Sequence, residues 1–433
     1  MALGGGTFTA QDKVLPGFYM SVISATRAPS MLSERGVAAI PVILDWGIEG
    51  EIFEAKTDRL QKESMNIFGY SLEHEKLKGL RELFNNVKTT YLYRLNKGEK
   101  AKNEMATAKY SGVRGNDIKI VVATNIDDVA KFDVTTLLDN SRVSTQTVAS
   151  MSELKNNDFV DWIDSATLEL TAGMPLTGGT NGTITGGEYQ DFLDKIESYS
   201  FNTLGCLSTE KEIQDLFIAF TKRLREEVGV KFQTVVYKRP DVNFEGIISV
   251  ENKVVDGLES SLVYWVTGIT AGCPINKSNT NRKYDGEFEV DTNYTQTQLA
   301  DSLFEGKFIL HKQNNEVYTL RDINTFRTFA EHKGEAFAEN QTIRVVDQIA
   351  IDIGSIFSKK YIGKIKNNDS GRVSLWGDIV SHHNELQAMG AIDEFKSEDV
   401  IVAQGDDKRS IAITDSITLV GFAEKLYMTV VIN

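Results

Sequence analysis

The chain has 433 residues, enough for two to four domains, and a hydrophobic fraction of 41% supplies real cores. Its formal net charge of −14 argues against a general nucleic-acid-binding protein, which needs a basic surface. Two cysteines, Cys206 and Cys273, form no disulfide framework, and no signal peptide or apolar run of about 20 residues is visible, so we expect a soluble protein with reduced core thiols, made in a reducing cytoplasm.

The N-terminal quarter divides into an arm and a small domain. Residues 1–25 are expected to form a flexible arm, because Gly4-Gly5-Gly6 gives mobility and Pro16-Gly17 leads into a strand at 18–23. Residues 26–95 are predicted to form an α+β domain. Its expected elements are a buried strand at 36–44, a helix at 72–84 and a strand at 91–95.

The next segment, residues 96–178, is dominated by short strands separated by polar turns. The expected strands are 118–122, 132–135 and 167–170. This pattern is typical of a small β-sandwich inserted into the chain. The glycine-rich run 178–182 closes it, and because no Lys-Ser/Thr follows, we interpret this run as a flexible hinge rather than a phosphate loop.

From residue 179 to 335, helices alternate with strands, which predicts an α/β domain with a largely parallel sheet. A helix is expected at 189–196, and strands are expected at 203–207, 232–237 and 247–250. Thr209 and Glu212 have the spacing of a capping box that would open a long helix. The apolar stripe of that helix is Ile213, Leu216, Phe217, Phe220, Leu224 and Val228.

Residues 336–422 are predicted to form a C-terminal α+β domain, with a first helix at 343–357 and a second helix capped by Ser374. The apolar positions expected on the first helix are Ile343, Val346, Ala350, Ile353 and Phe357. Strands at 400–402 and 411–414 flank a turn at 405–407. Residues 423–433 then alternate apolar and mixed side chains with period two, which predicts a terminal strand.

A strand with an apolar face at each end of the chain must pair internally or with a neighbour, because unpaired edges aggregate. If the neighbour is another copy of the chain, the protein is a building block of a polymer.

The sequence offers few residues for catalysis or metal binding. It has five histidines but no HExxH, no CxxC and no GxSxG motif. His382-His383 is the one histidine cluster, and neighbouring helical residues point about 100° apart, so the pair does not easily share an ion. We therefore predict no catalytic residue, no cofactor, no metal and no enzymatic activity.

Basic residues cluster once in this acidic chain. Between residues 355 and 372, five cations stand against one Asp369, a local charge of 5 − 1 = +4; the cations are Lys359, Lys360, Lys364, Lys366 and Arg372. Such a cluster is typical of a helix C-terminus with a solvated loop. The alternative interpretation is a docking face for an acidic partner.

Several stretches, in order along the chain, together resemble the tail sheath proteins of contractile bacteriophages and phage-tail-like bacteriocins. They are Pro16-Gly17-Phe18-Tyr19, residues 36–41 and 45–47, residues 93–96 and 108–117, the junction 176–182, residues 324–326 and 343–347, Tyr361-Ile362-Gly363-Lys364, and residues 424–430. Each stretch is weakly specific by itself, and the specificity lies in their order. Arg27-Ala28-Pro29 matches no part of the family pattern.

This resemblance implies a structural protein that stacks as hexameric rings around an inner tail tube and contracts from a metastable extended state to drive the tube through a cell envelope. It implies a subtilisin-like α/β core without protease activity, an outward-facing β-sandwich, and terminal strands exchanged between subunits. The exchanged residues would be Phe18, Tyr19, Met20, Val22, Leu426, Tyr427, Met428, Val430 and Ile432.

The resemblance also implies partners and a location. The tube would be contacted from 340–366, which places Lys359, Lys360, Lys364 and Lys366 as tube-contact residues. Baseplate and tail-terminator proteins are further implied partners, without nucleic acid or direct membrane insertion. Assembly is expected in the host bacterial cytoplasm, followed by residence in a phage tail or a released particle.

Two other readings stay open at the level of sequence. One is an α/β hydrolase-like enzyme, which would need a nucleophile beside His311 or His332, the histidines in or near the α/β domain. The other is a non-polymerising binding module whose two ends pair within one chain.

Overall fold

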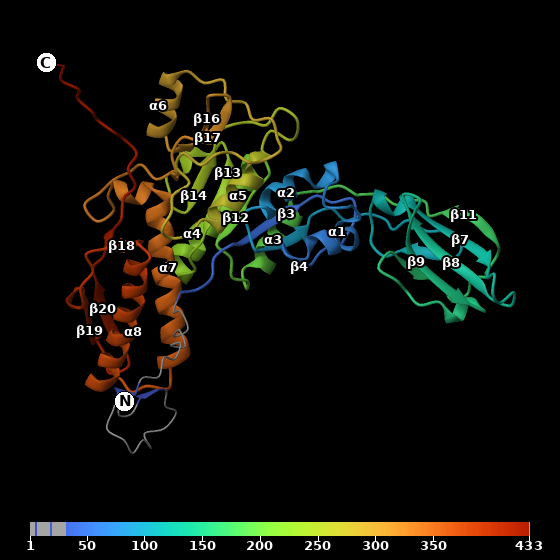
Figure 1. Cartoon of the computed structure of the whole chain (residues 1–433), viewed down its shortest axis with the longest axis horizontal. Coiled ribbons are helices and arrows are strands. Elements are labelled where there is room, and N and C mark those ends of the chain that lie inside the picture. Colours follow the sequence, from blue (N-terminus) through green and yellow to red (C-terminus); the bar gives the residue numbers. More distant parts are fainter. Residues whose placement is uncertain (1–4, 7–17, 20–31, 433) are drawn as a thin grey trace.

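The computed structural model describes residues 5–6, 18–19 and 32–432. Figure 1 shows a central body with a β-rich lobe extending from one side and a helical domain on the other. The last residues stretch away from the body as an extended segment. Phe18–Tyr19 (β2) pairs in parallel with Gly5–Gly6 (β1) of the same chain, whereas the predicted strand residues Met20 and Val22 lie outside the described residues.

A seven-stranded sheet forms the central body, in the order β15-β14-β13-β12-β3-β5-β4. All neighbouring strands are parallel except β4, which runs antiparallel to β5. The strands are β3 (Val37–Val42), β4 (Ile52–Lys56), β5 (Thr89–Arg94), β12 (Thr203–Gly205), β13 (Gln233–Tyr237), β14 (Ile247–Val250) and β15 (Lys307–Phe308). The predicted parallel sheet of the α/β domain is thus confirmed.

This sheet joins two segments that the sequence analysis placed in separate domains, 26–95 and 179–335. Ala38 and Ala39 of β3 pair with Thr203 and Leu204 of β12, so strands from both segments form one layer. The physical reason lies in β3, whose residues are buried on both faces except at Val37. A strand of this kind belongs inside a parallel sheet covered by helices on both sides.

Helices cover both faces of the sheet. α3 (Gly187–Ile196) and α4 (Lys211–Arg223) pack on the face that carries Ala39 and Leu204, whereas α1 (Leu60–Phe68), α2 (Lys78–Phe84) and α5 (Leu262–Gly272) pack on the other. α6 (Gln296–Phe304) precedes β15.

The start of α4 differs from its prediction. Its N-cap is Glu210 without a side-chain hydrogen bond, so the predicted capping box of Thr209 and Glu212 is wrong. The helix continues as a π turn, Leu224–Val228, which leaves Val228, the last residue of the predicted stripe, 55% exposed.

The inserted lobe is a β-sandwich. Its strands are β6 (Ala106–Ala108), β7 (Ile118–Thr124), β8 (Phe132–Leu138), β9 (Ser141–Val148), β10 (Val160–Trp162) and β11 (Thr171–Pro175). A four-stranded antiparallel sheet, β11-β7-β8-β9, and the pair β10-β6 share one apolar core. The predicted strand at 167–170 is wrong, because the chain pairs with β7 only from Thr171 onward.

The C-terminal domain is built on α7 (Asn340–Ile356) and α8 (Asp369–Ala388), which lie side by side and share a core (Figure 1). α7 ends in a π turn, Phe357–Tyr361, and Ala350 of its predicted apolar stripe is exposed. The N-cap of α8 is Asn368, whose side chain accepts from the Gly371 amide, so the predicted cap at Ser374 is wrong. The remaining strands are β16 (Leu310–Gln313), β17 (Glu316–Thr319), β18 (Ile392–Asp393), β19 (Val400–Gln404), β20 (Ile411–Asp415) and β21 (Thr418–Leu419).

Candidate assembly surfaces

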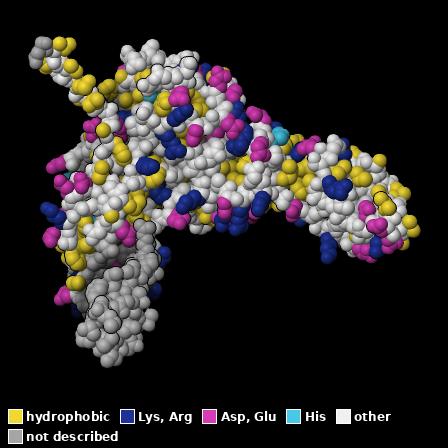
Figure 2. Space-filling model, in the orientation of Figure 1, with side chains coloured by type: hydrophobic (Ala, Val, Ile, Leu, Met, Phe, Trp, Pro, Cys, Tyr) yellow, Lys and Arg dark blue, Asp and Glu magenta, His cyan; other side chains and the backbone are white. Residues whose placement is uncertain are grey.

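The C-terminal arm, residues 425–432, projects from the molecule with its apolar side chains uncovered. Figure 2 shows hydrophobic side chains along this projection. The exposed fractions are 88% for Leu426, 76% for Met428, 70% for Val430 and 92% for Ile432, and Tyr427 is 88% exposed. The arm is not a strand in the single chain, because a strand requires a backbone hydrogen-bonding partner. Its period-two pattern suits addition to a sheet edge.

The arm root, residues 420–424, is where the chain is last held by the body. The Gln341 side chain donates to the Val420 carbonyl at 2.9 Å. Glu424 Oε2 lies 2.9 Å from Arg321 Nε, and the Thr280 hydroxyl donates to Glu424 Oε1 at 3.2 Å. Arg321 also pairs with Glu339. Burial raises the pKa of the Glu339 carboxyl group to about 7. A few contacts therefore mark the end of the ordered body and the start of the free arm.

The four predicted tube-contact lysines lie on the exposed bend that joins α7 to α8. Lys359 and Lys360 belong to the π turn after α7, and Lys364 and Lys366 follow it. Lys360 pairs with Asp378 Oδ1 at 3.0 Å, and Lys364 donates to the Lys359 carbonyl at 2.5 Å. The structure thus brings the predicted cluster together on one bend.

The lysine bend also carries exposed apolar residues. Ile362 is 59% exposed and Ile365 is 47% exposed. In Figure 1 the bend lies at the end of the C-terminal domain opposite the departing arm. The two predicted assembly surfaces are therefore separate and can be altered independently.

Sequence reasoning missed a third feature, the place where the central body meets the β-sandwich. We call it the sandwich junction, and it is formed by residues 94–99, 111–117 and 177–182. The Asn181 side chain donates to Asp45 Oδ1 at 2.8 Å and accepts from the Val113 amide at 3.0 Å. Asn96, which is buried, bonds both backbone groups of Leu44, at 2.8 and 2.9 Å.

Two glycines of the run 178–182, Gly179 and Gly182, are tightly packed within this junction, whereas a Cβ on Gly178 would have no atom within 4 Å. A Cβ on Gly179 would lie 2.4 Å from the Gly112 carbonyl oxygen, and one on Gly182 would lie 1.5 Å from the Lys97 carbonyl oxygen. Buried Arg94 donates to the Gly47 and Ser111 carbonyls, both at 3.0 Å. The prediction of a flexible hinge is therefore wrong: these glycines permit close backbone approach.

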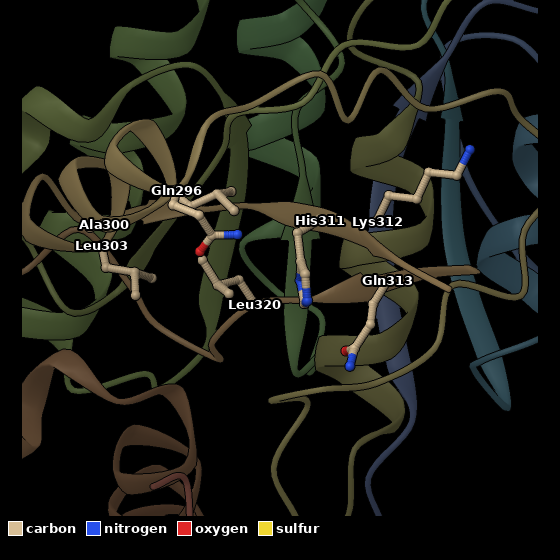
Figure 3. Close-up of a pocket in the computed structure, with 8 residues that line it drawn as sticks. Gln296, Ala300, Leu303, His311, Lys312, Gln313 and Leu320 are labelled. Atoms are coloured by element: carbon tan, nitrogen blue, oxygen red, sulfur yellow. The ribbon is translucent and has the colours of Figure 1, made fainter. Parts of the chain in front are cut away.

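The hydrolase-like alternative depends on His311 or His332. His311 lines a hollow of 470 Å³ between α6 and β16, where Figure 3 shows it with Gln296 and Gln313. No serine, cysteine or carboxylate is among the residues that line this hollow. His332 is exposed. Among residues 5–6, 18–19 and 32–432, no group of three or more His, Cys, Asp or Glu side chains could hold a metal ion.

Both cysteines are buried and unpaired, as predicted, and burial raises the pKa of the Cys206 thiol to about 12. In the described part of the chain, no helix is both long and apolar enough to cross a membrane.

Three family models match successive parts of the chain. The phage tail sheath protein β-sandwich domain matches residues 96–181, the phage tail sheath protein central domain matches residues 182–325, and the phage tail sheath C-terminal domain matches residues 332–433. The first model ends within the glycine-rich run of the sandwich junction.

Individual known proteins are also similar to this chain over nearly its whole length. The phage-like element PBSX protein XkdK of Bacillus subtilis (strain 168) is 32% identical over 472 residues, covering 100% of both chains. The crystal structure of a sheath tail protein from Desulfitobacterium hafniense superposes with a TM-score of 0.83 at 36% identity, covering 95% of this chain and 99% of that one. The contracted helical sheath of the anti-feeding prophage has a TM-score of 0.58 at 13% identity, covering 97% and 99%, which shows a shared fold.

Proposed function

Since the chain belongs to the phage tail sheath protein family and is a structural subunit of a contractile sheath, we propose that its subunits are linked by exchanged terminal strands. The observation that carries this proposal is the C-terminal arm, which presents four alternating apolar side chains with no cover in the single chain. Because β-addition supplies main-chain hydrogen bonds as well as apolar contact, a sheet edge on a second copy is the partner that such an arm needs.

The energy of one exchanged strand is small. Burying Leu426, Met428, Val430 and Ile432 gains about 1.5–3 kcal/mol each. Ordering about eight residues costs about 1–2 kcal/mol each. These terms nearly cancel, so one strand is a weak link, and two arms together with domain contacts make assembly cooperative. Free subunits would then stay apart until a nucleus forms.

The proposed assembly is a sleeve of stacked hexameric rings that assembles around an inner tail tube in the host cytoplasm and then resides in a phage tail or a released particle. Solved sheath structures with this fold, in a contracted helical sheath and in a baseplate, support self-assembly and contact with a baseplate. A tail terminator would close the distal end. The mainly parallel core sheet supports a subtilisin-like arrangement, and we propose that it has no catalytic role.

We assign the tube contact to the lysine bend. Lys359 and Lys366 form no ion pair within the described part of the chain, so their charges are available to an acidic surface. This part of the proposal is independent of strand exchange, because the bend and the arm lie at opposite ends of the C-terminal domain (Figure 1).

The decisive experiment deletes residues 426–433. We expect a folded chain with an unchanged unfolding midpoint, because the described side chains at 426–432 are largely exposed in the single subunit, and complete loss of polymerisation. Electron microscopy for striated cylinders and sedimentation at rising concentration give the two readouts. Lys425→Ala, in the same arm but outside the apolar face, is the matched control and should polymerise. If the truncated chain still forms long cylinders, the strand-exchange proposal fails.

A further inference from the structure

Two adjacent histidines of α8 lie inside the C-terminal domain, with side chains that are 0% exposed. Their Nδ1 atoms are 3.1 Å apart. His382 Nε2 lies 3.0 Å from Asp352 Oδ2 on α7, and His383 Nε2 lies 2.8 Å from Oδ2 of Asp415, the last residue of β20. The four side chains form one line, which we call the histidine chain. The rings meet although the sequence predicted that neighbouring helical residues point apart.

The histidine chain has a proton requirement that follows from its geometry. A neutral imidazole has one N–H donor and one acceptor nitrogen, an imidazolium has two donors, and an ionised carboxylate only accepts. Three hydrogen bonds in this line need three ring protons, one on each Nε2 and one between the two Nδ1 atoms. Two neutral rings carry only two. Without the third proton, two nitrogen lone pairs face each other 3.1 Å apart in a buried space.

We propose that the histidine chain is a proton-binding site that holds one extra proton and thereby ties together α7, α8 and β20. The positive charge sits between two carboxylates, which compensates its burial. When the proton leaves, one of the three hydrogen bonds is lost, and the contact between α8 and a neighbouring element weakens.

The surroundings of the histidine chain favour this charge state. Burial acts to raise the pKa of Asp352, but hydrogen bonds from His382, the Ser33 amide and Gln348 outweigh it and hold that pKa below its usual value. Asp352 is thus an ionised acceptor. The charge of the Arg35 guanidinium also interacts with the Asp352 carboxylate.

Two further residues lie near the rings. Glu385 lies one turn further along α8 and is half-exposed. The Phe395 ring, centred 5.0 Å from the His383 ring, closes the other side.

The histidine chain reaches the roots of both terminal segments. At one end, Asp352 Oδ1 accepts from the Ser33 amide at 2.9 Å, and Gln348 donates to the Ser33 carbonyl at 3.1 Å. At the other end, Asp415 stands five residues before the arm root. This inference deepens the proposed function, because one bound proton would stiffen both places from which the chain extends toward neighbouring copies.

The first test counts protons in the full-length protein. Nitrogen-15 NMR of ¹⁵N-imidazole-labelled histidine at pH 8 distinguishes N–H from bare ring nitrogens, and His332→Gln removes an exposed ring for assignment. We expect three protons on the buried pair, against two for a pair of neutral rings. Two protons would overturn the proposal. Such a result would leave strand exchange untouched, because the arm deletion tests that separately.

The second test measures proton linkage. Above about pH 6.5 an unfolded histidine is neutral. A folded state that keeps one extra proton then loses stability as pH rises, and the unfolding constant increases up to about tenfold per pH unit. We expect this slope in the parent and in His332→Gln, but a flatter one in His383→Gln, which removes one ring. Parallel slopes in all three would contradict the proposal. If His383→Gln does not fold, the proton count still decides.

Discussion

The central body passes into other parts of the chain at two contrasting places, the sandwich junction and the arm root. The junction is held by buried side chains: Arg94 and Asn96 are 0% and 1% exposed, and both bond backbone groups. The arm root is held by a few contacts between partly exposed groups, with Arg321 and Glu424 side chains 32% and 24% exposed. The first connection joins two lobes into a single body, and the second releases an extended segment from it (Figure 1).

The comparison indicates where a sheath subunit can change shape. A packed core is not continuously deformable, so movement concentrates where few contacts oppose it. We expect the central body and the β-sandwich to move together, while residues after Glu424 absorb the displacement between copies. Substitutions at one connection and then at the other test this difference.

The largest effect is expected from Gly182→Ala at the junction. Gly182 has φ +65°, and a Cβ would lie 1.5 Å from the Lys97 carbonyl oxygen. Left-handed strain of about 1–2 kcal/mol adds to the clash, so we expect a loss of about 3 kcal/mol or more in unfolding free energy. Denaturant unfolding measures it.

Two glycines serve as controls for that substitution. Gly229, at φ +88° with no atom within 4 Å, should lose only the strain term as Gly229→Ala. Gly421, in the arm root and equally uncrowded, should change by less than about 0.5 kcal/mol as Gly421→Ala. Equal losses for Gly182→Ala and Gly229→Ala would mean that the junction is not tightly packed.

The second prediction compares two polar anchors. Asn181→Ala removes one hydrogen-bond donor to Asp45 and the side-chain acceptor of the Val113 amide, and we expect a loss of about 2 kcal/mol in unfolding free energy. Glu424→Ala removes a partly exposed ion pair and should cost less than about 1 kcal/mol.

A second readout separates these anchors. Limited proteolysis should cut the arm of Glu424→Ala faster than that of the parent, because its root is released. The arm of Asn181→Ala should be cut at the parental rate. If Glu424→Ala lost as much unfolding free energy as Asn181→Ala, the arm root would be held as firmly as the junction, which contradicts the difference drawn between them.

The sequence predicted the contents of the fold better than its connections. The period-two and apolar runs of β13 and β14, the alternation of helices with strands and the inserted β-sandwich were readable from local pattern. The pairing of Ala38 with Thr203 was not, because it joins segments 165 residues apart and depends on β3 needing cover on both faces.

The candidate assembly surfaces were likewise predictable only where their pattern is local in the sequence. The arm's alternation and the lysine cluster are local and were visible in the sequence, and their roles stay predictions. The glycines at 178–182 suggested flexibility, because a sequence does not reveal that the Gly112 and Lys97 carbonyls approach them. The sequence analysis likewise placed the cap of the second C-terminal helix at Ser374, whereas the structure has it at Asn368, because either side chain can cap a helix and the local pattern did not show where the helix begins.

A smaller effect is expected at the lysine bend. Charge reversal of Lys359, Lys360, Lys364 and Lys366 should weaken binding to isolated tubes by roughly 0.2–1 kcal/mol per residue at low salt, and the difference from the parent should shrink as salt screens these charges. Cosedimentation over a salt series measures it. Lys62→Glu with Lys155→Glu, exposed lysines elsewhere, should bind like the parent. Unchanged binding at all salt concentrations would remove the assignment of the bend.

The last prediction concerns pH, and it also separates the two connections. Burial raises the pKa of Glu339, which shares Arg321 with Glu424, to about 7 from 4.5. The folded state therefore binds this proton more tightly than the unfolded state, and stability falls as pH rises between about 4.5 and about 7.

At the junction the sign is opposite. Burial acts to raise the pKa of Asp45, but bonds from Asn181 and Tyr70 bring it below 3.8, so its contribution is present above that pH and is lost only as pH falls below it. Between pH 5 and pH 8 the arm root should respond and the junction should not. Glu339→Gln should reduce the fall in the unfolding midpoint over this range relative to the parent. An equal fall in both proteins would show that Glu339 does not titrate there.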